Sequence, residues 1–293
     1  MDTDRQLYES RATGWRAGVY DDVRATFRAP VVNWIFRTLM ANDPELTRYL
    51  WGQVKQTFTT RAFGQYSVAY RDAVLSAVES GDRDLPRYRR ADLGLDPAEF
   101  RELAGQAETF DVVAPRLAVL FEVVDRSLRG DPVGDGDDER AAATEPMPAW
   151  LDRDRGRSPT MVDDVPAELA DAAGGIRAFH GLDDDLPSIY RCLAQWPEYL
   201  RTAWDDLEPA FESPAFDRAC ERARETTEAF VDSVPYPPRI APDDLRTRGT
   251  DEATITELRE LFETFNRGPI ETVLPALPAY AATLNVAGRR ELD

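Results

Sequence analysis

An internal repeat limits the folds open to this chain more than any other feature of its sequence. The matched pairs of segments are residues 35–39 (IFRTL) with 189–193 (IYRCL), residues 44–51 with 197–204, and residues 96–110 with 251–265. Three matches in the same order predict a tandem duplication of one unit of roughly 100 residues. Because duplicated units tend to pack about a pseudo-twofold axis, a pocket between them would receive equivalent positions from both.

Helical periodicity fits this duplication. Apolar residues recur every three or four positions through most of the chain, as in Val31, Trp34, Ile35 and Leu39. Few segments alternate between apolar and polar residues in the manner of strands. The sequence therefore predicts an all-α protein with two tandem pseudo-repeated helical units, packed about a pseudo-twofold axis and joined by a long linker.

A shift in composition sets the predicted boundaries. Residues 131–165 are rich in Asp, Gly, Pro and Arg, which is typical of a linker. We expect a first helical repeat over 1–130, a linker over 131–165 and a second helical repeat over 166–293. Trp150 and Leu151 are the residues expected to anchor the middle of the linker.

The charge balance restricts the partners. The chain has 54 acidic and 35 basic side chains, a net charge of −19 that repels phosphate backbones and argues against nucleic acid. No apolar run is long enough to span a bilayer, and the N-terminus is not a secretory signal, so we expect a cytoplasmic protein. Lys55 is the single lysine, and an acidic, arginine-rich, lysine-poor composition is typical of halophiles.

Scarce residues exclude several chemistries. Two cysteines, Cys192 and Cys220, are too few for a disulfide framework, and one histidine, His180, cannot supply a His-rich metal site. Neither common nucleotide-binding glycine motif occurs. Cys192 is expected to be a small buried apolar residue. His180 is expected to end a helix, where its partial positive charge would interact favourably with the carbonyls at the helix C-terminus. Acid–base chemistry would then fall to carboxylates, with no metal or organic cofactor.

Several segments resemble the group I 2-haloacid dehalogenases, the DehI family. They are residues 20–30 (YDDVRATFRAP), 37–39 (RTL), 129–134 (RGDPVG), and the second-half HG and QWP at 180–181 and 195–197. The resemblance covers roughly residues 20–290. It implies an aspartate that activates a water, which displaces halide from C2 of a short 2-halocarboxylic acid without an ester intermediate. It also implies a site between the repeats, a small-molecule carboxylate as substrate, and a homodimer.

The resemblance leaves two positions open for the activating aspartate. Counting forwards from His180-Gly181 places Asp185 there, whereas counting backwards from Trp196-Pro197 places Ile189 there. Asp185 could act as a general base, and Ile189 could not. The acidic run at 183–185 has a structural alternative, in which it caps the following helix.

Six further residues are candidates for contact with the substrate. Arg37 and Arg191 are equivalent in the repeat, and a guanidinium can bind a carboxylate through two hydrogen bonds. The predicted lining of the pocket is Trp34, Asn33, Ile189 and Tyr190. All but Ile189 have a structural alternative: core packing for the aromatic residues, a salt bridge for the arginines, and a solvent-facing position for Asn33.

Two other functions remain open on the sequence alone. The fold could persist without the chemistry, as a protein that binds a small carboxylate or as a helical interaction protein. Alternatively, the same pocket could hydrolyse or decarboxylate a non-halogenated acid.

Overall fold

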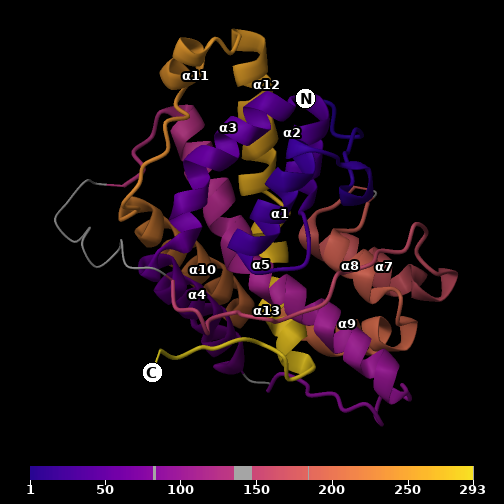
Figure 1. Cartoon of the computed structure of the whole chain (residues 1–293). Coiled ribbons are helices and arrows are strands. Elements are labelled where there is room, and N and C mark those ends of the chain that lie inside the picture. The colour runs from indigo at the N-terminus through magenta and orange to yellow at the C-terminus, as the bar shows by residue number, and fades with distance from the viewer. Residues whose placement is uncertain (82–83, 135–146, 184, 293) are drawn as a thin grey trace. The chain divides into compact units, whose positions relative to one another are not determined.

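The computed structural model is helical, as predicted (Figure 1). It describes residues 1–81, 84–134, 147–183 and 185–292, and those residues contain no β-strand. The elements are η1 (Glu9–Arg11), α1 (Trp15–Phe27), α2 (Trp34–Asn42), α3 (Pro44–Val54), η2 (Lys55–Thr59), α4 (Arg61–Glu79), α5 (Pro97–Arg129), η3 (Ala167–Leu169), α7 (Ala170–His180), α8 (Ser188–Leu193), α9 (Pro197–Phe211), α10 (Pro214–Asp232), α11 (Pro242–Arg248), α12 (Glu252–Asn266) and α13 (Ile270–Thr283).

Local sequence signals explain where several helices begin and end. Proline occupies the first position of α3 and of α9, where its missing N–H costs no helical hydrogen bond. Asp43 precedes α3, and its carboxylate accepts a hydrogen bond from the Leu46 N–H at 2.9 Å. Helix α7 ends where Gly181 adopts a φ of 66°, a conformation that favours glycine.

The chain divides into two compact units. The first consists of Met1–Tyr66, Arg116–Arg153 and Thr227–Asn266. The second consists of Ser67–Pro115, Asp154–Thr226 and Arg267–Asp293. Each unit draws segments from both halves of the sequence, and the predicted repeat boundaries stay a prediction.

Aromatic side chains fill the core of the first unit around Phe27. Its ring makes edge contacts with Phe36 at 5.7 Å, Trp51 at 5.8 Å and Phe58 at 4.9 Å between ring centroids. The indole N–H of Trp51 donates to the Asp22 carboxylate at 2.7 Å. These contacts hold α1, α2 and α3 together around the start of α2.

The core of the second unit is also aromatic. Phe179 stacks on Phe211 at 5.6 Å and contacts Trp204 at 6.1 Å. Trp51 and Trp204, which end the matched segments 44–51 and 197–204, are both buried. The two matched segments also form corresponding ion pairs on the surface: Arg48 with Glu45 in the first unit, and Arg201 with Glu198 in the second.

The described part of the predicted linker is firmly attached within each unit. In the first unit Asp152 forms a buried ion pair with Arg116 at 3.1 Å, and Leu151 is buried as expected. Trp150, in contrast, is 49% exposed. In the second unit Arg155 donates to the Glu108 carboxylate at 2.9 Å. Residues 135–146 of the linker lie outside the described residues.

Candidate functional site

Three predicted site residues lie together at the first turn of α2, in the first unit. Asn33 precedes the helix, and its side chain does not cap it. Its Oδ1 atom is buried and has no hydrogen-bond partner among the described residues. Trp34, half-buried, stacks on Phe265 of α12 with ring centroids 4.8 Å apart. A buried acceptor without a partner therefore lies next to an aromatic stack.

Arg37 is the fourth residue of the same helix and completes its first turn. Its guanidinium lies over the ring of Tyr8, with its central carbon 4.9 Å from the ring centroid. Its Nε atom is buried and lacks a hydrogen-bond partner within the described part of the chain. A cation held against an aromatic face with an unused donor is suited to hold a carboxylate.

Arg191, the repeat equivalent of Arg37, is engaged differently. In the second unit its Nε and Nη2 atoms donate to the backbone carbonyl of Val162 at 3.1 and 2.9 Å. The Val162 N–H in turn donates to the Arg191 carbonyl at 3.1 Å. Two of its donors thus tie the 154–166 segment to α8.

Ile189 and Tyr190 lie on α8 and are buried. Ile189 is 2% exposed and Tyr190 is fully enclosed. The ring of Tyr190 makes an edge contact with Tyr280 of α13 at 5.6 Å. Ile189 thus provides an apolar side chain, and Tyr190 an aromatic ring with a hydroxyl group.

Asp185 is exposed and lies in the loop between α7 and α8. The residue that caps α8 is Pro187, and no side chain caps this helix, so the structural alternative in which the acidic run caps it is wrong for the described members, Asp183 and Asp185. Asp184 lies outside the described residues. Leu186, next to Asp185, is buried and anchors this end of the loop.

His180 ends α7, as expected, but is not a charged residue at that end. It is 4% exposed, and burial lowers the pKa of its imidazole to about 4. Its Nε2 atom lies 2.6 Å from the hydroxyl of Tyr190, and its Nδ1 atom lies 2.7 Å from the hydroxyl of Thr272. The imidazole is therefore neutral at neutral pH, and both of its nitrogens are hydrogen-bonded.

Cys192 is fully buried on α8, which confirms its expected place in the core. Its thiol donates to the Gln106 side-chain carbonyl at 3.0 Å. Burial raises the pKa of this thiol to about 12, so the nucleophilic thiolate is scarce at neutral pH.

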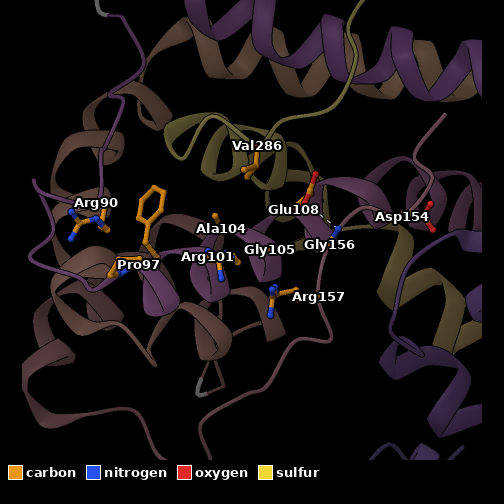
Figure 2. A pocket seen from close by; sticks show the side chains of 11 residues that line it. Arg90, Pro97, Arg101, Ala104, Gly105, Glu108, Asp154, Gly156, Arg157 and Val286 are labelled. Atoms are coloured by element: carbon orange, nitrogen blue, oxygen red, sulfur yellow. Dashed lines mark hydrogen bonds between the residues drawn. The ribbon is translucent and has the colours of Figure 1, made fainter. Parts of the chain in front are cut away.

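A surface pocket of about 780 Å³ lies in the second unit, against the first half of α5 (Figure 2). Its lining includes Arg90, Arg101, Arg157 and Glu108, and none of the predicted site residues. Arg157 is paired with Glu102 at 2.8 Å, and the carboxylate of Glu108 accepts from the Gly156 N–H at 3.1 Å. These ion pairs and hydrogen bonds fasten the 154–157 segment to α5.

Two further classes of feature are absent from the described residues. Within them, no cluster of three or more His, Cys, Asp or Glu side chains could hold a metal ion. None of the helices among them combines the length and the apolar character needed to cross a membrane.

Known proteins resemble this chain over most of its length. The family model described as "Halocarboxylic acid dehydrogenase DehI" matches residues 30–166 and 186–276. A protein from Rhizobium sp. (strain NHG3) named "(R)-2-haloacid dehalogenase" is 29% identical over 253 residues, which cover 84% of this chain and 93% of that protein. A protein of the same name from Pseudomonas putida is 25% identical over 274 residues, 89% of this chain and 86% of that protein.

A solved structure shares the fold. "The complex structure of D-2-haloacid dehalogenase mutant with D-2-CPA" superposes with a TM-score of 0.81 at 21% identity, over 95% of each chain. The residues between the two matched ranges of the family model, 167–185, include both His180 and Asp185.

Proposed function

The chain belongs to the halocarboxylic acid dehydrogenase DehI family, and from that premise we propose that it is a hydrolase that releases halide from C2 of a short 2-halocarboxylic acid. The family match over residues 30–166 and 186–276 carries this proposal, because the similar proteins from Rhizobium and Pseudomonas are both named for dehalogenation. The chain is accordingly an enzyme that acts on carbon–halide bonds.

The proposed mechanism uses a water activated by Asp185. The carboxylate accepts a proton from the water as the water oxygen attacks C2 of the substrate. The carbon–halogen bond breaks, and halide leaves with its electron pair. Attack opposite the leaving group inverts the configuration at C2 and gives a 2-hydroxy acid. Asp185 is exposed and is not used to cap α8, so its carboxylate is accessible to water.

On α2, we assign Arg37 to the substrate carboxylate and Asn33 and Trp34 to the substrate's other groups. The unused Nε donor of Arg37 and the unpaired Oδ1 acceptor of Asn33 support this assignment. The indole N–H of Trp34 could assist departure of the halide, because a weak donor directed at developing negative charge lowers the barrier.

On α8, the proposed contacts are Ile189, Tyr190 and Arg191. Ile189 and Tyr190 would offer an aliphatic and an aromatic surface to the substrate. Arg191 is the weaker candidate for the carboxylate, because its Nε and Nη2 atoms already donate to Val162.

We also propose that the two halves of the sequence are structural repeats. Helices α4 and α10 both have 19 residues. Each end of α10 follows the corresponding end of α4 by the same number of residues that separates Pro44, at the start of α3, from Pro197, at the start of α9. The same interval separates Arg28 from Gly181, the residues in left-handed conformation that follow α1 and α7. Packing of the repeats about a pseudo-twofold axis and assembly into a homodimer belong to the same proposal.

Adaptation to high salt is the proposed reason for the acidic composition. A net charge of −19 on 293 residues repels itself at low ionic strength, and salt screens that repulsion. A halophilic type of family member would carry this charge without loss of stability in its own cytosol.

A catalytically silent relative that binds a small carboxylate is the second candidate. Asp185 falls just before the second matched range, which begins at residue 186, and the other position for the base is filled by the buried Ile189. In this case Arg37 would still hold a carboxylate, but no group would activate water.

Bromide release from the separate enantiomers of 2-bromopropionate tests the function, in KCl and with bromide-specific detection. We expect bromide and lactate in equal amounts, with (S)-lactate from (R)-2-bromopropionate. Folded protein that binds the acid without releasing bromide would support the silent relative, and retained configuration would overturn direct displacement by water.

A further inference from the structure

His180 and Tyr190 close the loop that carries Asp185. Helix α7 ends at His180, α8 begins at Ser188, and the His180 Nε2 and Tyr190 hydroxyl lie 2.6 Å apart. Both side chains are buried, with exposed fractions of 4% and 0%. Because the contact joins the two ends of the loop, the exposed Asp185 is held on a short connection that is fixed on both sides.

A second hydrogen bond anchors the imidazole itself. The Nδ1 atom of His180 lies 2.7 Å from the hydroxyl of Thr272, at the start of α13, and that hydroxyl donates to the Pro269 carbonyl at 3.1 Å. In a neutral imidazole one nitrogen donates and the other accepts, and both nitrogens have a hydroxyl partner here. The ring therefore connects α7, α8 and α13.

The equivalent positions in the first half of the sequence lack this hydrogen bond. Phe27 is equivalent to His180 and Phe36 is equivalent to Tyr190, and their rings lie 5.7 Å apart in an edge contact. The His180 and Tyr190 rings lie 5.4 Å apart. Packing alone therefore suffices to join these two positions in the first half. The polar pair is an addition, and it occurs in the half that has Asp185.

Neither His180 nor Asp185 lies within a range matched by the family model. Residues 167–185 fall between the two ranges matched by the family model.

We propose that the hydrogen bond between His180 and Tyr190 is a positioning device, which fixes the end of α7 against the start of α8 so that the Asp185 carboxylate stays aligned with its water. This role rests on the proposed function. A catalytic group must be held to about 0.5 Å, and a displacement of about 1 Å can lower a rate about 100-fold. The hydroxyl of Tyr190 and the imidazole of His180 act through the loop, whereas the ring of Tyr190 is the proposed substrate contact, and the proton is accepted by Asp185.

Two variants test this role without emptying the core. Tyr190→Phe removes only the hydroxyl, and the double variant His180→Phe/Tyr190→Phe recreates the ring pair found at Phe27 and Phe36. For both we expect kcat of bromide release to fall about 10-fold or more, with KM within about 2-fold. We also expect hydrogen exchange of the Gly181 and Leu182 amides, which donate to the Ala178 and Arg177 carbonyls, to become about 10-fold faster.

Tyr199→Phe is the matched control. Tyr199 is equally buried in the second unit, and its hydroxyl lies 3.0 Å from that of Thr283. Removal of this hydroxyl should cost similar stability while kcat and exchange of the Gly181 and Leu182 amides stay unchanged. His180→Gln, which retains an amide donor and acceptor, should recover part of the kcat lost in the double variant.

The outcomes separate the two proposals. Unchanged kcat in Tyr190→Phe overturns the positioning role, whether or not the loop exchanges faster. An equal fall of kcat in Tyr199→Phe also overturns it, because any lost buried hydroxyl would then suffice. If the wild type releases no bromide, the proposed function fails and the positioning role falls with it, while amide exchange still decides whether the hydrogen bond closes the loop.

Discussion

The indole of Trp34 stacks on the ring of Phe265, with ring centroids 4.8 Å apart and planes 29° from parallel. The stack joins the first turn of α2 to the end of α12 within the first unit. Because α2 also carries Asn33 and Arg37, the stack fixes the helix turn on which three of the proposed substrate contacts lie.

Trp34→Phe separates the stacking role from the chemical one. The variant retains an aromatic ring over Phe265 and should lose less than about 1 kcal/mol of unfolding free energy. It lacks the indole N–H, so kcat for bromide release should fall about 10-fold if that group assists the halide. Denaturant unfolding and initial rates measure the two effects. A loss of stability without a loss of kcat would limit Trp34 to packing.

Arg37→Gln and Arg191→Gln should differ in their effects. A charge-assisted hydrogen bond contributes about 1.5–3 kcal/mol, so loss of the Arg37 guanidinium should raise KM about 10-fold or more. Arg191→Gln should mainly lower stability, because its guanidinium ties Val162 to α8. Initial rates over a range of 2-bromopropionate concentrations distinguish them. A larger KM effect in Arg191→Gln would reverse the assignment.

Stability should depend on pH through His180. Burial lowers its folded-state pKa to about 4, whereas the unfolded chain has the ordinary value of about 6.5. Between these values only the unfolded state binds the proton, so unfolding free energy falls as pH drops from about 6.5 to about 4 and is independent of this group above that range. The full effect is on the order of 3 kcal/mol.

Urea unfolding at several pH values checks this dependence. The chain has one histidine, so His180→Gln is the natural control, and its unfolding free energy should change less between about pH 5 and about pH 6.5 than that of the wild type. Parallel curves for the two proteins would contradict the burial of a neutral imidazole.

Salt should stabilise the fold. The Debye length falls from about 10 Å at about 0.1 M to about 3 Å at about 1 M salt, which screens the repulsion among 54 acidic side chains. The midpoint of thermal unfolding should therefore rise over that range of KCl, with a similar rise in NaCl. A midpoint that is independent of salt would argue against the halophilic type.

The all-α fold was predictable because helical periodicity is a property of the sequence itself. The bond between His180 and Tyr190 was not predicted. The repeat alignment does contain a signal for it, because the positions of Phe27 and Phe36 in the first half are occupied by His180 and Tyr190 in the second half. Sequence could show that substitution, but only the structure shows that the two new polar groups meet.

At the acidic run, residues 183–185, the sequence favoured a role that the structure does not show. Its position before a helix favoured a capping role, yet Pro187 occupies the capping position and Asp185 remains exposed. The choice between Asp185 and Ile189 depended on the length of the loop, and a count along the chain cannot determine how a loop places its residues. The two positions differ in burial, because Ile189 is buried and Asp185 is exposed.

The central claim is that Asp185 activates the water, and the most direct test compares bromide release by Asp185→Asn and Asp183→Asn with that of the wild type. Both aspartates are exposed residues of the same loop, so the two variants lose equal charge. We predict that kcat falls about 100-fold or more in Asp185→Asn and by less than about 2-fold in Asp183→Asn. Equal activity in Asp185→Asn and the wild type would contradict the claim.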